Sequence, residues 1–361
     1  MATQADTAVV VGTVSDYLTA KGDAKLYNIN LPAGVYLQAQ LTTPANADLD
    51  YDLYLLDAEG NILTGSDYYT YINGTAGTLP EALGYITSGD TATYYLYVLA
   101  SEGGSVSESF TLDYSVSTAC DSYEIDESVR QALAFTYGAG GAYIESRNLS
   151  SPIDNDWYVI TVPSSRIYDK LKISATTAST NTCSVEVYQN VASEGYQMKR
   201  VGSGNTISVS SGKYYIRVSN AKTMENFDDL DIQNYKLSIT PILKATGIVI
   251  TDLKGSEGLN KVVNYPGYGA HFRTQGSGTL TVYGVLTATD SSTGVTYAVG
   301  GEQINGLYYS PAWEANNTSA NAIRRGTGTT DSSGKFEIDI SLPPGIGAVS
   351  YTHLTLPTKL E

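Results

Sequence analysis

The chain has 361 residues, more than one hydrophobic core usually serves, so we expect two or three domains. Its 35 glycines and 30 tyrosines favour an all-β protein with many turns. Acidic residues outnumber basic ones by 37 to 21, and the net charge of −16 argues against nucleic acid and anionic membrane surfaces as partners. No apolar run approaches the length of a transmembrane helix, so we expect no membrane insertion.

The first residues, from Met1 to Asp6, lack the basic and apolar regions of a signal peptide. This leaves either a cytoplasmic protein or an internal piece of a longer secreted one. A surface poor in Lys and rich in Thr, Ser and Tyr is common among secreted bacterial proteins. The C-terminal tail, residues 349–361, also favours a fragment. We therefore expect an extracellular location, secreted or at the cell surface.

Residues 5–118 are expected to form the first unit, a β-sandwich. Between Val35 and Leu41 every second residue is apolar, which predicts a strand with one buried and one exposed face. The segment Asp57–Asn61 predicts a hairpin connection, because Gly60 can adopt the positive φ that such turns require.

Four acidic residues of this unit have the spacing of ligands in an EF-hand loop: Asp48, Asp50, Asp52 and Glu59. Leu53, however, occupies the position where that loop needs glycine for its sharp turn. We interpret these residues as a solvated acidic entry to a strand.

Residues 119–243 are expected to form the second unit, an acidic lead-in followed by another sandwich. Acidic residues crowd its start, and Ser128–Ala134 could form a helical turn. Three strand patterns of the first unit return here in the same order, with Trp157 expected in the core. The repeated pairs are Leu26–Pro32 with Trp157–Pro163, Tyr94–Val98 with Tyr214–Val218, and Phe110–Tyr114 with Tyr235–Ile239.

Residues 244–348 form a third expected unit, whose pattern differs from the first two. It looks like an Ig-like or transthyretin-like surface module that is truncated before its last strand, which would leave an unpaired edge. Residues 349–361 resemble translated read-through of a sequencing adapter, so we expect this tail to be non-native.

Motifs for catalysis are missing from the sequence. His271 is the only histidine outside the tail and is interpreted as an ordinary loop residue. No nucleophile elbow, metalloprotease helix or phosphate-binding loop occurs, so we expect no enzyme and no catalytic residues. Cys120 and Cys183 either pair in an oxidising compartment or remain two thiols.

Aromatic side chains offer one route to binding, because exposed rings stack on sugars or anchor protein contacts. Tyrosine is also favoured in strands whose surface is partly exposed, so a binding role and a purely structural role both stay open. The expected partner is an extracellular protein or glycan, and the oligomeric state is open. The aromatic clusters are Tyr68, Tyr69 and Tyr71, and Tyr308, Tyr309 and Trp313.

Short sequence motifs follow one another in a fixed order along the first two units. They are Gly22-Asp23, Leu31–Tyr36, Asp50–Leu55, Gly60-Asn61 and Thr93–Val98, and then Asp121–Ser128, Asp154–Tyr158 and Gly212–Val218. With these motifs, about residues 5–243 resemble the bacterial pre-peptidase C-terminal (PPC) domain family. The resemblance implies small jelly-roll-like β-sandwiches, which in that family lie outside the catalytic domain of secreted peptidases and other exported proteins.

The resemblance implies a calcium site between the acidic lead-in and the Asp-rich start of a strand, since some relatives bind Ca²⁺ there. Hard oxygen ligands from two segments suit this cation. The sequence departs from the usual lead-in at Ile125, where Pro is common, and at Asp126, where Asn is common. Carried over by position, the metal ligands are Glu124, Asp126, Glu127, Asp154 and Asp156.

Together these patterns predict an all-β array of two tandem jelly-roll-like sandwiches and an incomplete Ig-like sandwich. The function they favour is non-catalytic: an extracellular accessory array that spaces, stabilises or weakly binds protein or glycan. The alternative is a C-terminal accessory fragment of a secreted peptidase whose catalytic domain lies outside this chain.

Overall fold

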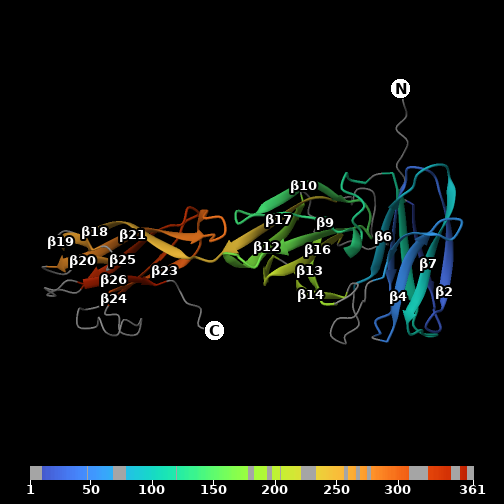
Figure 1. The fold of residues 1–361 in the computed structure, drawn as a ribbon, viewed down its shortest axis with the longest axis horizontal. Helices are drawn as coiled ribbons and strands as arrows, with labels where there is room; N and C mark the ends of the chain where they lie inside the picture. Colours follow the sequence, from blue (N-terminus) through green and yellow to red (C-terminus); the bar gives the residue numbers. More distant parts are fainter. Residues whose placement is uncertain are drawn as a thin grey trace, which may run out of the picture. The chain divides into compact units, whose positions relative to one another are not determined.

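The protein is almost entirely β-structure, as predicted (Figure 1). The computed structural model describes residues 10–46, 48–67, 79–118, 120–177, 183–192, 197–203, 205–220, 233–255, 259–265, 269–274, 278–308, 324–342 and 350–355. Most of the two aromatic clusters lies outside these residues. None of the helices in the described ranges is long and apolar enough to cross a membrane.

The chain divides into two compact units. One comprises Met1–Ser164 and Lys170–Pro241, and the other Ser165–Asp169 and Ile242–Glu361. The first unit thus contains both expected PPC-like sandwiches, and the second contains the expected third module. The finer boundaries at residues 118, 243 and 348 stay predictions.

The first sandwich consists of two antiparallel four-stranded sheets, with strand orders β1-β8-β3-β6 and β2-β7-β4-β5. Their facing sides enclose a core that includes Leu37, Leu53, Leu96 and Phe110. The strands are β1 (Val10–Asp16), β2 (Ala24–Leu31), β3 (Tyr36–Thr42), β4 (Asp50–Leu56), β5 (Ile62–Ser66), β6 (Glu81–Ile86), β7 (Ala92–Glu102) and β8 (Phe110–Ser117).

The predicted hairpin joins β4 to β5. The amide of Asp57 donates to the carbonyl of Asn61 at 3.0 Å, and Gly60 has a φ of 87°. This confirms the interpretation of the glycine, since side-chain-bearing residues rarely adopt such a conformation.

Strand β3 departs from the expected half-exposed pattern. Leu37, Ala39 and Leu41 face the core as predicted, but Tyr36 and Gln38 on the opposite face are also at most 2% exposed. The reason is that the acidic lead-in of the second sandwich covers this face, and a strand covered on both faces loses the alternation between buried and exposed residues.

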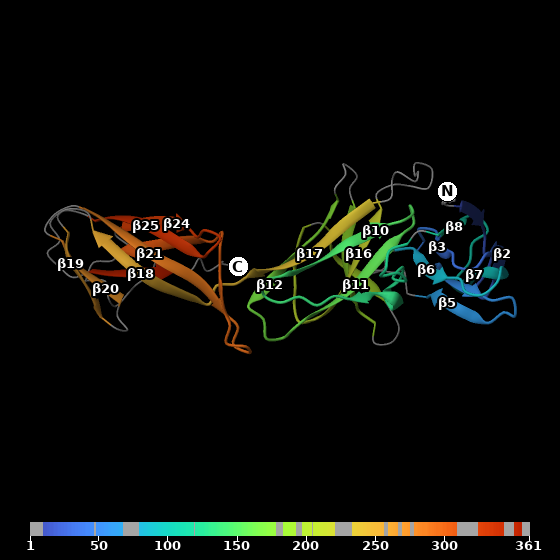
Figure 2. The same ribbon diagram turned by 90° about the horizontal axis from the view of Figure 1, so that it is seen from above.

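The second sandwich also has two sheets, with orders β10-β17-β12-β15 and β14-β13-β16-β11-β9. Figure 2 labels β10, β12 and β17 of the first of these sheets and β11 and β16 of the second. Trp157 is 1% exposed, which confirms its place in the core. The elements are the 3₁₀ helix η1 (Val129–Gln131) and strands β9 (Leu133–Ala134), β10 (Ala142–Leu149), β11 (Asn155–Val162), β12 (Tyr168–Thr177), β13 (Cys183–Asn190), β14 (Met198–Ser203), β15 (Thr206–Ser208), β16 (Gly212–Asn220) and β17 (Gln233–Leu243).

Strand order is shared by the two sandwiches. The sheet β2-β7-β4-β5 of the first matches β11-β16-β13-β14 of the second, and β1-β8-β3-β6 matches β10-β17-β12-β15. The repeated sequence patterns occupy matching places, namely β2 and β11, β7 and β16, and β8 and β17. The short strand β9 is an addition, and it pairs parallel to β11.

The second unit forms two further sheets. Strand β21 pairs with β18, β22 and β25, and a five-stranded sheet has the order β19-β20-β26-β23-β24. Its core includes Leu280, Val282, Ile304 and Ile338. The strands are β18 (Gly247–Gly255), β19 (Leu259–Tyr265), β20 (Gly269–Thr274), β21 (Gly278–Thr289), β22 (Thr296–Ala298), β23 (Gln303–Tyr308), β24 (Arg324–Thr329), β25 (Lys335–Leu342) and β26 (Ser350–Thr355).

Two expectations about this unit are not met. His271 lies in strand β20 and not in a loop. The edge expected to stay open is filled by β26, which comes from the tail and pairs with β20 and β23. An open strand edge accepts a new strand through main-chain hydrogen bonds that are independent of sequence. That the tail is non-native stays a prediction.

Candidate metal centre

The acidic lead-in runs alongside the start of β11 and is held there by hydrogen bonds from the amides of that strand. The amide of Trp157 donates to the carbonyl of Asp126 at 3.0 Å, and the amide of Asn155 donates to Glu127 Oε2 at 3.0 Å. These bonds bring the acidic residues of the lead-in next to Asp154 and Asp156, which frame the first residue of the strand.

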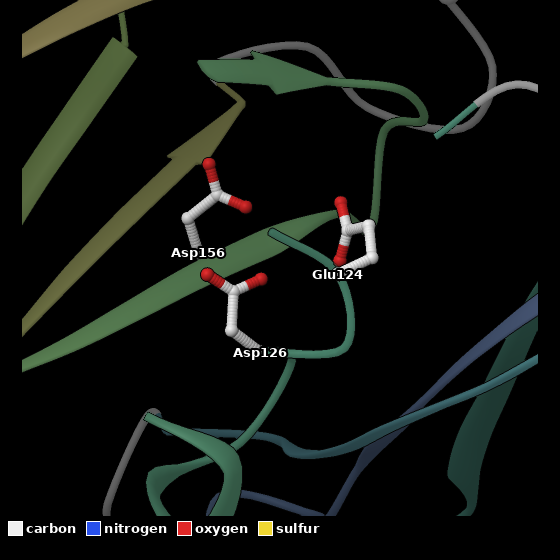
Figure 3. Close-up of side chains that lie close together, drawn as sticks. All are labelled: Glu124, Asp126 and Asp156. Atoms are coloured by element: carbon white, nitrogen blue, oxygen red, sulfur yellow. The ribbon is translucent and has the colours of Figure 1, made fainter. Parts of the chain in front are cut away.

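All five carboxylates predicted as metal ligands converge at this place. They form two groups, in each of which one oxygen per residue lies within 4.8 Å of the others. Figure 3 shows the first group, with Glu124 and Asp126 on the lead-in and Asp156 on the strand, their carboxyl groups turned toward a common space. The second group is Glu124, Glu127 and Asp154, so Glu124 belongs to both.

Burial sets this cluster apart from an ordinary acidic surface. Asp126, Glu127, Asp154 and Asp156 are each at most 1% exposed. Carboxyl oxygens without a hydrogen-bond partner occur at Glu124 Oε1, Asp126 Oδ1 and Asp154 Oδ1. A buried polar atom without a partner is costly, so several of them close together favour the binding of a cation or a proton.

Arg147 is the one described basic residue that neutralises the cluster, and sequence reasoning missed it. Its side chain is fully buried and forms ion pairs with Asp121 at 2.6 Å, with Asp126, and with Asp156 at 3.0 Å. Its Nε also donates to the hydroxyl of Tyr158 at 2.7 Å. An arginine isolated in a strand pattern gives no signal that it turns inward.

A β-bulge brings Arg147 to this position. The register between β10 and β17 shifts between Ile144 and Arg147, and Ser146 has a φ of 62°. Bulges re-aim side chains in this way, and here the shift lets arginine reach the carboxylates.

The first sandwich contributes Tyr36 and Gln38 to the same cluster. The hydroxyl of Tyr36 donates to Glu124 Oε2 at 2.7 Å and also contacts Glu127 Oε1. Gln38 Nε2 donates to Glu127 Oε1 at 2.7 Å. No sequence pattern links these two residues to the lead-in, because 88 to 91 residues separate them from the glutamates they contact.

The electrostatics of the cluster favour neutralisation. Burial, followed by the repulsion of Asp154, raises the pKa of Glu124 to about 8. The same two causes raise the pKa of Glu127 and of Asp156 well above their usual values. Burial and then Asp156 raise the pKa of Asp126 as well, against the opposing effect of Arg147. A proton or a cation beside these carboxyl groups would therefore stabilise the folded chain.

Arg147 makes the two groups unequal as cation sites. Its guanidinium already pairs with Asp126 and Asp156, and a second cation beside it would be repelled. The ion pairs described for Arg147 do not include Glu124, Glu127 or Asp154. The polar contacts of these three include donation from Ser150 to Asp154 and a contact of the Tyr36 hydroxyl with each glutamate. Oxygen ligands alone, free of histidine or thiolate, suit a hard cation such as Ca²⁺.

The EF-hand-like spacing in the first sandwich produces no such group. Asp48 and Glu59 are exposed, whereas Asp50 and Asp52 are 4% and 7% exposed at the start of β4, so the expectation of a solvated entry is wrong for these two. Ser101 donates to Asp52 at 3.2 Å, and burial followed by repulsion from Asp50 raises the pKa of Asp52 to about 6. In the described residues this pair does not belong to a group of three potential ligands.

The two cysteines are not joined by a disulfide, with Cys120 exposed and Cys183 partly buried. The bond envisaged for an oxidising compartment is therefore not part of this structure.

No protein-family model and no curated protein matches the chain. Among solved structures it is similar to the CUB1-EGF-CUB2 domain of human MASP-1/3, at 11% identity over 64% of this chain and 99% of that one, with a TM-score of 0.19. It is also similar to the CBM22-1-CBM22-2 tandem domain from Paenibacillus barcinonensis Xyn10C, at 10% identity over 66% of this chain and 92% of that one, with a TM-score of 0.20. Likenesses this distant say nothing about the function of this chain, and the resemblance to the PPC family stays a prediction.

Proposed function

We propose that the chain is a non-catalytic, extracellular accessory array in which one Ca²⁺ fixes the acidic lead-in to the second sandwich. The single observation that carries this proposal is the buried convergence of Glu124, Glu127 and Asp154, with unpartnered oxygens on two of them. A partner for the array, an extracellular protein or glycan, is proposed from the aromatic clusters of the sequence.

The burial of the cluster supports a structural role over a catalytic one. Four of the five carboxylates are at most 1% exposed, so a substrate could not contact them without unfolding the lead-in. A cation held among them would act on the folded state, because ligands from two segments are brought together only there.

Among cations, the donor set favours calcium. Zinc prefers nitrogen and sulfur ligands, and Mg²⁺ usually keeps several of its waters, which a buried carboxylate cluster does not easily accommodate. Extracellular calcium sites are typically weak, with dissociation constants of about 10⁻⁴ M, and are filled at millimolar Ca²⁺.

Thermal unfolding with and without chelator tests the proposal. At that affinity, millimolar Ca²⁺ adds about 1–2 kcal/mol to the stability of the unit that binds it, which corresponds to a rise in Tm of about 2–8 °C. Asp154→Asn should abolish the rise, and Glu337→Gln, an exposed change in the other unit, should keep it. An equal Tm in Ca²⁺ and in EDTA would contradict the proposal.

A further inference from the structure

We propose that the cation is shared between the two sandwiches of the first unit, with Gln38 of the first sandwich as a ligand, so that cation binding locks one sandwich onto the other. This inference rests on the proposed function, since it names a partner group for the same cation. It adds a residue that lies outside the second sandwich and its acidic lead-in.

Gln38 carries the first observation. Its side chain is 1% exposed, its Nε2 donates to Glu127 Oε1 at 2.7 Å, and its Oε1 has no hydrogen-bond partner. A buried amide that satisfies one end and leaves the other without a partner pays the full desolvation cost of the free oxygen.

A cation changes which end of this amide should face the carboxylates. The oxygen and nitrogen of a glutamine side chain are nearly alike in shape, so rotation by half a turn exchanges them at little steric cost. Rotation gives up the donation to Glu127 but breaks no bond of Oε1, which has no partner where it lies. With Ca²⁺ among Glu124, Glu127 and Asp154, the rotated amide would present its oxygen to the cation as a neutral ligand, a type that calcium sites commonly use.

Tyr36 lies two residues before Gln38 in β3 and contacts the same acidic cluster. Its hydroxyl contacts both Glu124 and Glu127 and thereby holds two of the proposed ligands in place. Both residues thus project from one strand of the first sandwich onto the lead-in.

The rest of the junction between the two sandwiches is also closely packed. A Cβ added at Gly84 of β6 would lie 2.6 Å from Glu127 Cγ and 2.7 Å from Ile125 Cγ2. Leu79 of the first sandwich belongs to an apolar cluster of the second that includes Trp157 and Met198. Arg130 Nε donates to Asp67 at 2.9 Å across the same junction.

The joint should respond to the cation because the cation draws its ligands together. It would hold Glu124 and Glu127 of the lead-in to Asp154, and both glutamates contact side chains of β3. Calcium therefore controls how firmly the first sandwich is attached, in addition to stabilising the second.

Hydrogen exchange on the full chain, in EDTA and in millimolar Ca²⁺, tests the sharing. We expect the backbone amides of residues 124–128 and those of β3 and β6 to exchange about tenfold more slowly in Ca²⁺. The edge strand β5 of the first sandwich provides an internal control and should not change.

Gln38→Ala and Gln40→Ala form the matched pair of variants. Gln40 also crosses the junction, as acceptor of a hydrogen bond from Asn155 Nδ2 at 3.3 Å, but it is not among the proposed ligands. Gln38→Ala should weaken Ca²⁺ binding in calorimetric titration by about tenfold or more and remove the protection of β3, whereas Gln40→Ala should do neither.

Gln38→Glu covers the case in which Gln38→Ala fails to fold. It keeps an oxygen and adds a charge, so it should bind Ca²⁺ at least as tightly as the native chain but melt at a lower temperature in EDTA. Protection confined to residues 124–128, with equal affinities for the two alanine variants, would overturn the sharing and leave the cation in place. No response to Ca²⁺ in any segment would overturn the proposed function itself.

Discussion

At the scale of single residues, the junction depends on one arginine among carboxylates. Arg147 is fully buried, and although burial alone would lower its pKa, Asp156 and Asp126 outweigh this and raise it. A guanidinium suits the place because its fork of donors can satisfy several oxygens at once. Arg147 thus balances the charge of Asp126 and Asp156. The proposed cation would balance the charge of the group of Glu124, Glu127 and Asp154.

Removing the arginine should therefore be costly. Arg147→Met keeps most of the side-chain volume but removes the guanidinium that pairs with Asp126 and Asp156. This should lower the free energy of unfolding of the first unit by about 3–5 kcal/mol. Urea unfolding measures this.

Lys236→Met is the matched control for that experiment. Lys236 lies in the paired strand β17, and its ion pair with Glu145 at 2.9 Å is exposed. Because exposed pairs contribute little, this variant should lose less than about 1 kcal/mol. Equal losses for the two variants would show that Arg147 does not carry the role assigned to it.

At the scale of strands, the sequence predicted the scaffold well and the contacts between its parts poorly. The repeated patterns fall on β2 and β11, β7 and β16, and β8 and β17, because alternation and turn residues are local signals. The five carboxylates were placed together by a family resemblance, and they do converge.

What escaped prediction depends on long-range contacts. Gln38 and Tyr36 read as the exposed face of a strand, and nothing in β3 itself announces that another segment covers them. Arg147 reaches the cluster through a bulge, which has no strong sequence signature. The burial of Asp50 and Asp52 was missed for the same reason, since strand pairing and not spacing decides it.

The fit of β6 against the lead-in gives a prediction at this scale. Gly84→Ala places a methyl group against Glu127 and Ile125 and should cost about 1–3 kcal/mol by overpacking. It should also reduce the rise of Tm in Ca²⁺, because the lead-in must move. Gly140→Ala, where nothing lies within 4 Å, is the control. A Gly84→Ala protein with native stability and calcium response would mean that this contact does not position the lead-in.

At the scale of the molecule, the two compact units differ in what holds them. The first contains two sandwiches joined by Leu79, the polar contacts of β3 and the acidic lead-in, and the second rests on its own core around Leu280 and Ile338. The proposed cation would act only within the first unit. Under this proposal the cation site depends on both sandwiches, because the lead-in of one and a strand of the other must meet.

The central claim is tested most directly by measuring calcium bound to the chelator-stripped full chain in equilibrium dialysis. The account predicts one Ca²⁺ per chain with a dissociation constant near 10⁻⁴ M, lost in Asp154→Asn and retained in Glu337→Gln. No retained calcium, or equal binding by Asp154→Asn and the native chain, would contradict it.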